Sequence, residues 1–178
     1  PYDAGTQWRA GARFGPRGVR EASTLFSFGH AGAYDSITQV TTLSLLARAI
    51  AWMSTEPNCA NQAFNVVNTD VFRWRELWPR LADAFGIPVG SLRPMKLVDI
   101  LAERQATWQA ICDAKGLPAG ALSGVANWGF ADATLERYWD EILSHNKLRR
   151  FGFDDWDDSV NRFFSILEQY RSAGILPR

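Results

Sequence analysis

Apolar residues recur at helical spacing over most of the chain from residue 41 onwards. Leu43, Leu46, Ala47 and Ile50 mark the apolar face of a first helix, and Pro57 ends it. The same spacing predicts further helices over residues 74–85, 97–115, 125–138 and 144–152, and a last helix that carries Val160, Phe163, Phe164, Leu167 and Tyr170. The pattern therefore predicts a helix-dominated chain.

Residues 63–67 depart from this pattern, because they are short, apolar and β-branched and are followed by turn-forming residues at 68–70. They predict a buried strand that ends in a loop. Six glycines interrupt residues 1–35, which predicts mainly loop there, with a short helix over 16–24 as the exception. The predicted fold class is α/β, helix-dominated, with a loop-rich N-terminal arm.

Charge and composition narrow the classes of partner. The 178 residues include 19 basic and 19 acidic side chains, so no net field attracts nucleic acid or an anionic membrane. Cys59 and Cys112 lie far apart and form no CxxC motif, which argues against a disulfide framework or a zinc site. We expect a cytoplasmic protein with no nucleic-acid or membrane partner. Because the chain starts with proline, we also expect it to begin inside a longer sequence.

The first 23 residues have a distinctive spacing of glycine, arginine and Gly-Pro, with PYDAGT at residues 1–6 and RAGARFGPRGVREAS at residues 9–23. This segment resembles the early part of an agmatinase, of the ureohydrolase family. That family's chemistry requires two manganese ions held by histidines and aspartates in GGDH, DxHxD and SxDxD motifs. His30 and His145 are the only histidines and lie in none of these motifs, so we predict no metal-binding residue.

Five sequence blocks follow in order from about residue 33 to residue 178. They are NQAFNVVNTDVFRW at 61–74, Trp108 with KGL at 115–117, WGFAD at 128–132, SHNK at 144–147 and FGF at 151–153. Together they resemble the C-terminal part of an atypical extended short-chain dehydrogenase/reductase, of the progesterone 5β-reductase and iridoid synthase-like branch. The two resemblances meet at about residues 28–36. We therefore expect an agmatinase-like arm over 1–35 and a substrate-side domain over 36–178.

The second resemblance implies a reductase that transfers hydride from NADPH to enones or carbonyl compounds. In that family the nucleotide lies on an N-terminal Rossmann half, against a glycine-rich turn. Gly11, Gly15 and Gly18 do not form a GxGxxG motif, and no tyrosine is followed by a lysine four residues later. We therefore predict an incomplete C-terminal portion of the fold, without catalytic or cofactor-binding residues and with no cofactor bound to this chain alone.

The resemblance places Phe130 and Trp128 in a Trp-Trp-Phe run that lines the family's substrate pocket. Gly129 replaces the middle tryptophan of that run, which implies a wider pocket. Trp74, Trp78 and Trp108 are more typical of core residues. Asn68 and Thr69 are typical of a turn, and the acidic run at 154–158 is typical of helix capping, by Asp155 or Asp157, rather than of a metal site.

Three classes of function stay open from the sequence. The first is a reductase by ancestry that is inactive without the cofactor-binding half, and the second is a ureohydrolase. The third is a non-catalytic binding or scaffold domain. Cofactor binding separates the first from the third, and metal content separates the second from both. The aromatic pocket predicts a small apolar substrate, and apolar surface left without the Rossmann half predicts self-association.

Overall fold

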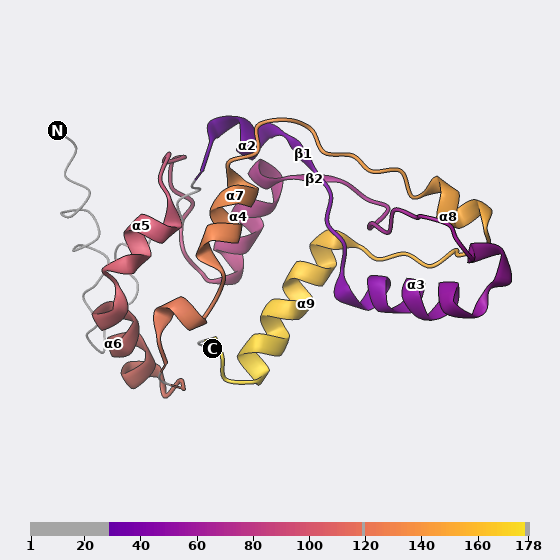
Figure 1. The fold of residues 1–178 in the computed structure, drawn as a ribbon. Coiled ribbons are helices and arrows are strands. Elements are labelled where there is room, and N and C mark those ends of the chain that lie inside the picture. The colour runs from indigo at the N-terminus through magenta and orange to yellow at the C-terminus, as the bar shows by residue number, and fades with distance from the viewer. Residues whose placement is uncertain (1–28, 119, 177–178) are drawn as a thin grey trace.

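The computed structural model describes residues 29–118 and 120–176 and is helix-dominated (Figure 1). Helices α3 and α8 lie at one end of the molecule, α2, α4, α5, α6 and α7 gather at the other, and α9 lies between the two groups. The elements are α2 (Ala31–Asp35), β1 (Ile37–Thr38), α3 (Leu43–Thr55), the 3-10 turn η1 (Pro57–Cys59), β2 (Phe72–Arg73), α4 (Trp74–Ala84), α5 (Leu97–Ala102), α6 (Gln105–Lys115), the 3-10 turn η2 (Leu122–Gly124), α7 (Trp128–Leu135), α8 (Asn146–Arg150) and α9 (Ser159–Ser172).

Helix α3 forms where the sequence predicts it, but its buried face differs from the predicted one. Thr42 caps the helix by accepting a hydrogen bond from the backbone N–H of Leu45. Leu45 and Ala49 are buried, whereas Leu43 and Ile50 are exposed. The predicted face was wrong because Leu45, Ala49 and Trp52 repeat with the same spacing as Leu43, Ala47 and Ile50, so spacing alone does not select a face.

The core of this end joins three segments that are far apart in the sequence. Leu45 and Ala49 of α3 pack against Leu148 of α8 and against Phe153, and all four side chains are buried. Phe64 packs on the same cluster from the segment between η1 and β2. This end of the molecule therefore depends on apolar contacts between α3, α8 and residues 63–67 rather than on a sheet.

Residues 63–67 do not form the strand that the sequence predicts. Their backbone is held by isolated side-chain bonds, from Lys147 Nζ to the carbonyl of Ala63 at 2.9 Å and from Thr41 Oγ1 to the carbonyl of Val66 at 2.8 Å. A strand needs a regular ladder with a neighbour, and within the described ranges only β1 and β2 form one, antiparallel. The predicted burial is confirmed in part, since Val67 is buried.

Aromatic side chains hold α9 against the second group of helices. Phe163 of α9 contacts the ring of Phe72 at a centroid distance of 5.7 Å and that of Trp74 at 6.0 Å. Helix α4 agrees with its prediction over 74–85 and buries Leu77 and Trp78. The aromatic cluster thus links β2, α4 and α9.

Two other predicted helices differ from the structure in extent. The helix predicted over 97–115 is interrupted at residues 103–104 and forms α5 and α6, although Gly116 ends α6 in a left-handed conformation as predicted. The helix predicted over 125–138 is shorter, because Asn127 caps α7 by accepting from the backbone N–H of Phe130. Local side-chain caps therefore set boundaries that apolar spacing does not reveal.

Residues 31–35 form the short helix α2 instead of the predicted loop. The His30 side chain caps it by accepting a hydrogen bond from the backbone N–H of Gly32 at 2.9 Å. Gly29 has a φ of 89°, and a Cβ there would lie 2.2 Å from the carbonyl oxygen of Leu135, so only glycine fits. The helix predicted over 16–24 lies outside the described residues. None of the helices in the described part of the chain is long and apolar enough to cross a membrane.

Candidate functional site

The two predicted substrate-side residues lie in the first turn of α7 but in different environments. Trp128 is half-buried, and its Nε1 donates to the carbonyl of Leu122 at 3.1 Å. Phe130 is 72% exposed. A Cβ built on Gly129 would contact only the Asn127 side chain, at 3.6 Å, so the space beside Phe130 is open. The structure therefore presents Phe130 as an accessible apolar side chain and holds Trp128 against η2.

Asp132 fixes the orientation of α7 relative to α5. Its two carboxylate oxygens accept from the backbone N–H groups of Leu97 and Val98 at 2.7 and 3.0 Å. These donors belong to the first turn of α5, where backbone N–H groups lack partners within the helix. The buried carboxylate of Asp132 on α7 therefore caps the N-terminus of α5. This contact fixes α7, and Phe130 with it, against α5.

Trp74, Trp78 and Trp108, which the sequence pattern indicates are more typical of core residues, all contact neighbouring residues of the fold. Trp78 is 7% exposed, and Trp74 lies in the aromatic cluster with Phe72. Trp108 donates from Nε1 to the carbonyl of Gly120 at 3.1 Å. These residues stabilise the helices that surround α7.

A buried polar network joins the N-terminal ends of α3 and α9, and sequence reasoning missed it. Asn68 is fully buried; its Oδ1 accepts from the backbone N–H of Thr42 at 3.1 Å, and its Nδ2 donates to Ser159 Oγ at 2.9 Å. Ser159 Oγ donates in turn to Asp70 Oδ1 at 2.6 Å. The predicted turn at Asn68 is therefore an anchoring point. The sequence signal that points to Asn68 is its position as a polar residue directly after an apolar run.

Asp157 extends this network and binds three side chains. It accepts from Thr42 Oγ1, from Ser44 Oγ at 3.0 Å and from Arg162 at 2.8 Å. Burial raises the pKa of Asp157, but these hydrogen bonds and the Arg162 charge outweigh burial, so the pKa lies below the ordinary value of 3.8. The carboxylate therefore stays ionised at neutral pH.

The acidic run at 154–158 serves capping and ion pairing. Asp158, not the predicted Asp155 or Asp157, caps α9 by accepting from the backbone N–H of Asn161 at 2.8 Å. Asp155 pairs with Arg48 at 2.5 Å. Among the described residues, no group of three or more histidine, cysteine or acidic side chains is placed to hold a metal ion.

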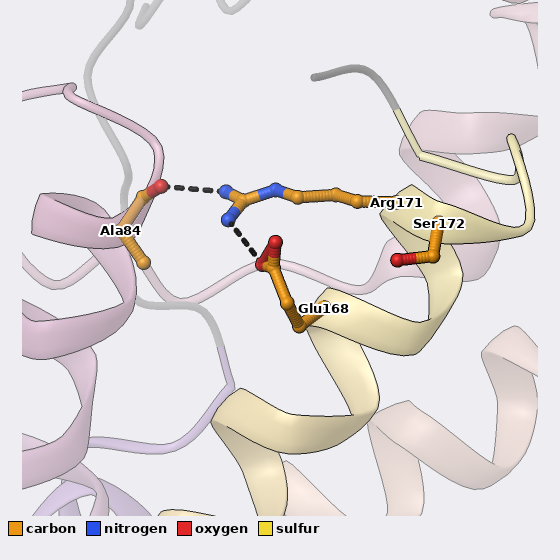
Figure 2. Close-up of a pocket in the computed structure, with 4 residues that line it drawn as sticks. All are labelled: Ala84, Glu168, Arg171 and Ser172. Atoms are coloured by element: carbon orange, nitrogen blue, oxygen red, sulfur yellow. Dashed lines mark hydrogen bonds and ion pairs between the residues drawn. The ribbon is translucent and has the colours of Figure 1, made fainter.

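Arg171 occupies a hollow of about 530 Å³ between α4 and α9 (Figure 2). Its guanidinium donates to the carbonyl of Ala84 at 2.6 Å and pairs with Glu168 at 3.2 Å. Ala84 ends α4, where free carbonyls and the helix dipole favour a cation. Because the Ala84 carbonyl and the Glu168 carboxylate already bind the Arg171 guanidinium, we interpret this hollow as a structural contact between α4 and α9 rather than as a ligand site.

His145 is a buried histidine at the start of α8. It is 6% exposed, and neither ring nitrogen has a hydrogen-bond partner within the described ranges. Its ring lies 6.1 Å from that of Phe153. Burial, with a smaller contribution from the Arg149 charge, lowers the pKa of His145 below the ordinary value of 6.5. The imidazole is therefore neutral in the folded protein at neutral pH.

Acidification below pH 6.5 should destabilise the protein through His145. The unfolded chain takes up a proton near that pH more readily than the folded chain, in which the pKa of His145 is lowered, so the free energy of unfolding should fall by at most about 1.4 kcal/mol per pH unit. His145→Leu should flatten this dependence in urea unfolding at pH 7.5 and 5.5. Asp157 does not titrate in this window, since its pKa lies below 3.8. An unchanged slope in His145→Leu would show that another group is responsible.

Comparison with known proteins shows which proteins the chain is similar to. No family model matches the sequence. The chain is 32% identical over 161 residues to the (S)-8-oxocitronellyl enol synthase of Nepeta racemosa, a match over 88% of this chain and 41% of that protein. It is 34% identical over 160 residues to a short chain dehydrogenase of Penicillium aethiopicum, over 82% of this chain and 42% of that protein. It is also 31% identical over 160 residues to the 3-oxo-Delta(4,5)-steroid 5-beta-reductase of Arabidopsis thaliana, over 88% and 41%.

By their names these relatives are an enol synthase, a short chain dehydrogenase and a steroid reductase. The chain spans about two fifths of the length of these relatives. The resemblance of residues 33–178 is confirmed at this level, whereas the agmatinase-like resemblance of residues 1–35 has no support in these relatives. The substrate-side roles of Phe130 and Trp128 stay predictions.

Proposed function

We propose that this chain is the substrate-side part of an NADPH-dependent oxidoreductase that reduces enones or related carbonyl compounds. The observation that carries the proposal is the similarity to reductases over 88% of the chain. The names of two relatives specify an 8-oxocitronellyl compound and a 3-oxo steroid. Both molecules combine a carbonyl group with an apolar frame. We infer a substrate of the same kind for the complete protein.

The described residues do not fit a nicotinamide dinucleotide. Such a cofactor needs a glycine-rich turn between a strand and the N-terminus of a helix, where backbone N–H groups meet the pyrophosphate. Neither β1 nor β2, of two residues each, leads into a turn of that kind. Because the sequence also contains no GxGxxG or YxxxK motif, we propose that the cofactor and the catalytic acid belong to a nucleotide-binding half outside this chain.

Two surfaces support the need for a covering half. The outer face of α3 is apolar around Ile50, which is 55% exposed, and an apolar helix face is normally covered by another element. Residues 63–67 are apolar except for Asn65 and have no neighbouring strand in the described structure. A nucleotide-binding sheet packed on α3 and extended by residues 63–67 would cover both. Left uncovered, these surfaces favour self-association, which we propose for the isolated chain.

Phe130 and Trp128 are the residues that we assign to the substrate side. Phe130 is accessible, is carried by a helix that Asp132 anchors to α5, and has open space beside it at Gly129. An exposed ring of this kind supplies apolar contact area for a hydrocarbon frame. Trp128 holds the same turn of α7 against η2 through its hydrogen bond to the carbonyl of Leu122.

The isolated chain should bind no NADPH. Energy transfer from its eight tryptophans to reduced nicotinamide measures this directly. Adding in trans the part of the Arabidopsis 5-beta-reductase that the match leaves uncovered should restore NADPH binding and enone-dependent NADPH oxidation. Ile50→Glu should block this complementation by placing a charge on the outer face of α3. Ile142→Glu, at an apolar position that is 61% exposed and lies outside α3, is the matched control. Saturable NADPH binding by the isolated chain would contradict the proposal.

A further inference from the structure

A groove of about 500 Å³ runs between the first turn of α3 and the length of α9. The two helices begin side by side, because Thr42 and Asp157 are hydrogen-bonded and Asn68 binds both ends, and they then diverge (Figure 1). The groove volume falls within the range of about 300–1,000 Å³ that small-molecule sites occupy. It lies on different elements from Phe130.

One end of the groove is polar. Ser159 and Arg162 line it from α9, and the Thr42 and Ser44 hydroxyls line it from α3. Besides the backbone bond from its N–H to the carbonyl of Asp158, Arg162 hydrogen-bonds to one other described residue, through its guanidinium to Asp157 at 2.8 Å, and its side chain is 34% exposed. A guanidinium has five N–H donors, so donors of Arg162 stay free at this end. Its positive charge, in contrast, is already balanced by Asp157.

The other end of the groove is mainly apolar and open, with Gln169 as a polar side chain among its lining residues. Phe163, Ile166 and Tyr170 follow one another along α9, and Leu43 faces them from α3. Leu43 is 82%, Ile166 37% and Tyr170 46% exposed, so these side chains present apolar surface to solvent. The groove therefore has two poles. The hydrogen-bonding pole lies at Arg162, whose charge Asp157 compensates, and the apolar pole lies about two turns further along α9.

We propose that this groove binds an uncharged, mainly apolar molecule with a single hydrogen-bond acceptor. The acceptor takes a free N–H of Arg162, and the hydrocarbon body lies along Phe163, Ile166 and Tyr170. A carboxylate is disfavoured, because Asp157 neutralises Arg162 and a second anion beside Asp157 meets like-charge repulsion. A carbonyl oxygen gains a hydrogen bond from a charged donor without that repulsion.

The test compares two probes of equal chain length, 2-decanone and decanoate, by saturation-transfer NMR and titration at pH 7. The protein is kept at a concentration where it is monomeric by light scattering. We expect 2-decanone to bind in a saturable manner and about tenfold or more tightly than decanoate, since the decanoate carboxylate meets like-charge repulsion from Asp157 and the ketone does not. Equal affinities, or tighter binding of decanoate, would overturn the proposal.

Two variants locate the site. Arg162→Met should weaken 2-decanone binding about tenfold, and decanoate should bind no better than to the unchanged protein, because Asp157 then lacks the Arg162 charge. Because that variant also loses the pair with Asp157, Ile166→Glu provides a second test at an exposed position that does not threaten folding. It places a charge in the apolar pole and should abolish 2-decanone binding. Val98→Glu on α5 is the control that should bind normally. Undiminished binding in Ile166→Glu, with a native melting curve, would place the ligand elsewhere.

Discussion

Replacing Leu45 with alanine should lower the free energy of unfolding by about 2–5 kcal/mol, the range for a leucine removed from a closed core. Leu45 has no exposed surface and packs with Ala49, Leu148 and Phe153. These contacts connect α3 to α8, and the described structure provides no sheet at this end to replace them. Urea unfolding followed by circular dichroism measures the change. Leu45→Met, which nearly preserves the volume, should cost less than about 1.5 kcal/mol.

Leu43→Ala is the matched control, because Leu43 lies two residues earlier in the same helix and is 82% exposed. It should change the free energy of unfolding by less than about 0.5 kcal/mol. Comparing Leu45→Ala with Leu43→Ala tests whether α3 buries the face seen in the structure or the face that the sequence predicts. A larger loss in Leu43→Ala than in Leu45→Ala would restore the predicted face and contradict the packing of α3.

The comparison on α3 shows what the sequence can and cannot predict. The existence of the helix follows from apolar spacing and from Thr42 and Pro57 at its ends. Its orientation does not follow, since the sets Leu43–Ala47–Ile50 and Leu45–Ala49–Trp52 have the same spacing. Only the contacts with Leu148 and Phe153, about a hundred residues later, select one set.

Residues 97–115 illustrate the same limit. No glycine or proline marks an interruption there, yet the helix breaks at residues 103–104. Gln105 explains the new start, because its side chain accepts from the backbone N–H of Leu122 at 2.7 Å and donates to the carbonyl of Gly120. Such tertiary bonds depend on residues that the local pattern does not contain. Gly116, whose effect is local, was predicted correctly.

The sequence indicated which proteins the chain is related to, but it did not predict the geometry of the candidate site. The ordered blocks between residues 61 and 153 indicated the reductase relationship that the relatives support. The same blocks placed Phe130 on a helix but gave no sign that it is exposed, whereas Trp128 is half-buried. Asn68 itself binds residues 26 and 91 positions away, so the local signal, a polar residue after an apolar run, could not identify its partners.

Asn68→Ala should be the most damaging polar substitution and should lower the free energy of unfolding by about 2–4 kcal/mol. The change leaves the buried backbone N–H of Thr42 without its acceptor and removes the bond to Ser159, so the starts of α3 and α9 lose their shared anchor. Asn65→Ala is the control, since Asn65 is exposed and makes one weak bond, at 3.5 Å to the carbonyl of Ser144. It should cost less than about 0.5 kcal/mol. Hydrogen exchange gives a second readout, because the first turns of α3 and α9 should lose protection together in Asn68→Ala. Equal stability of the two variants, or loss of protection in only one helix, would show that Asn68 does not join them.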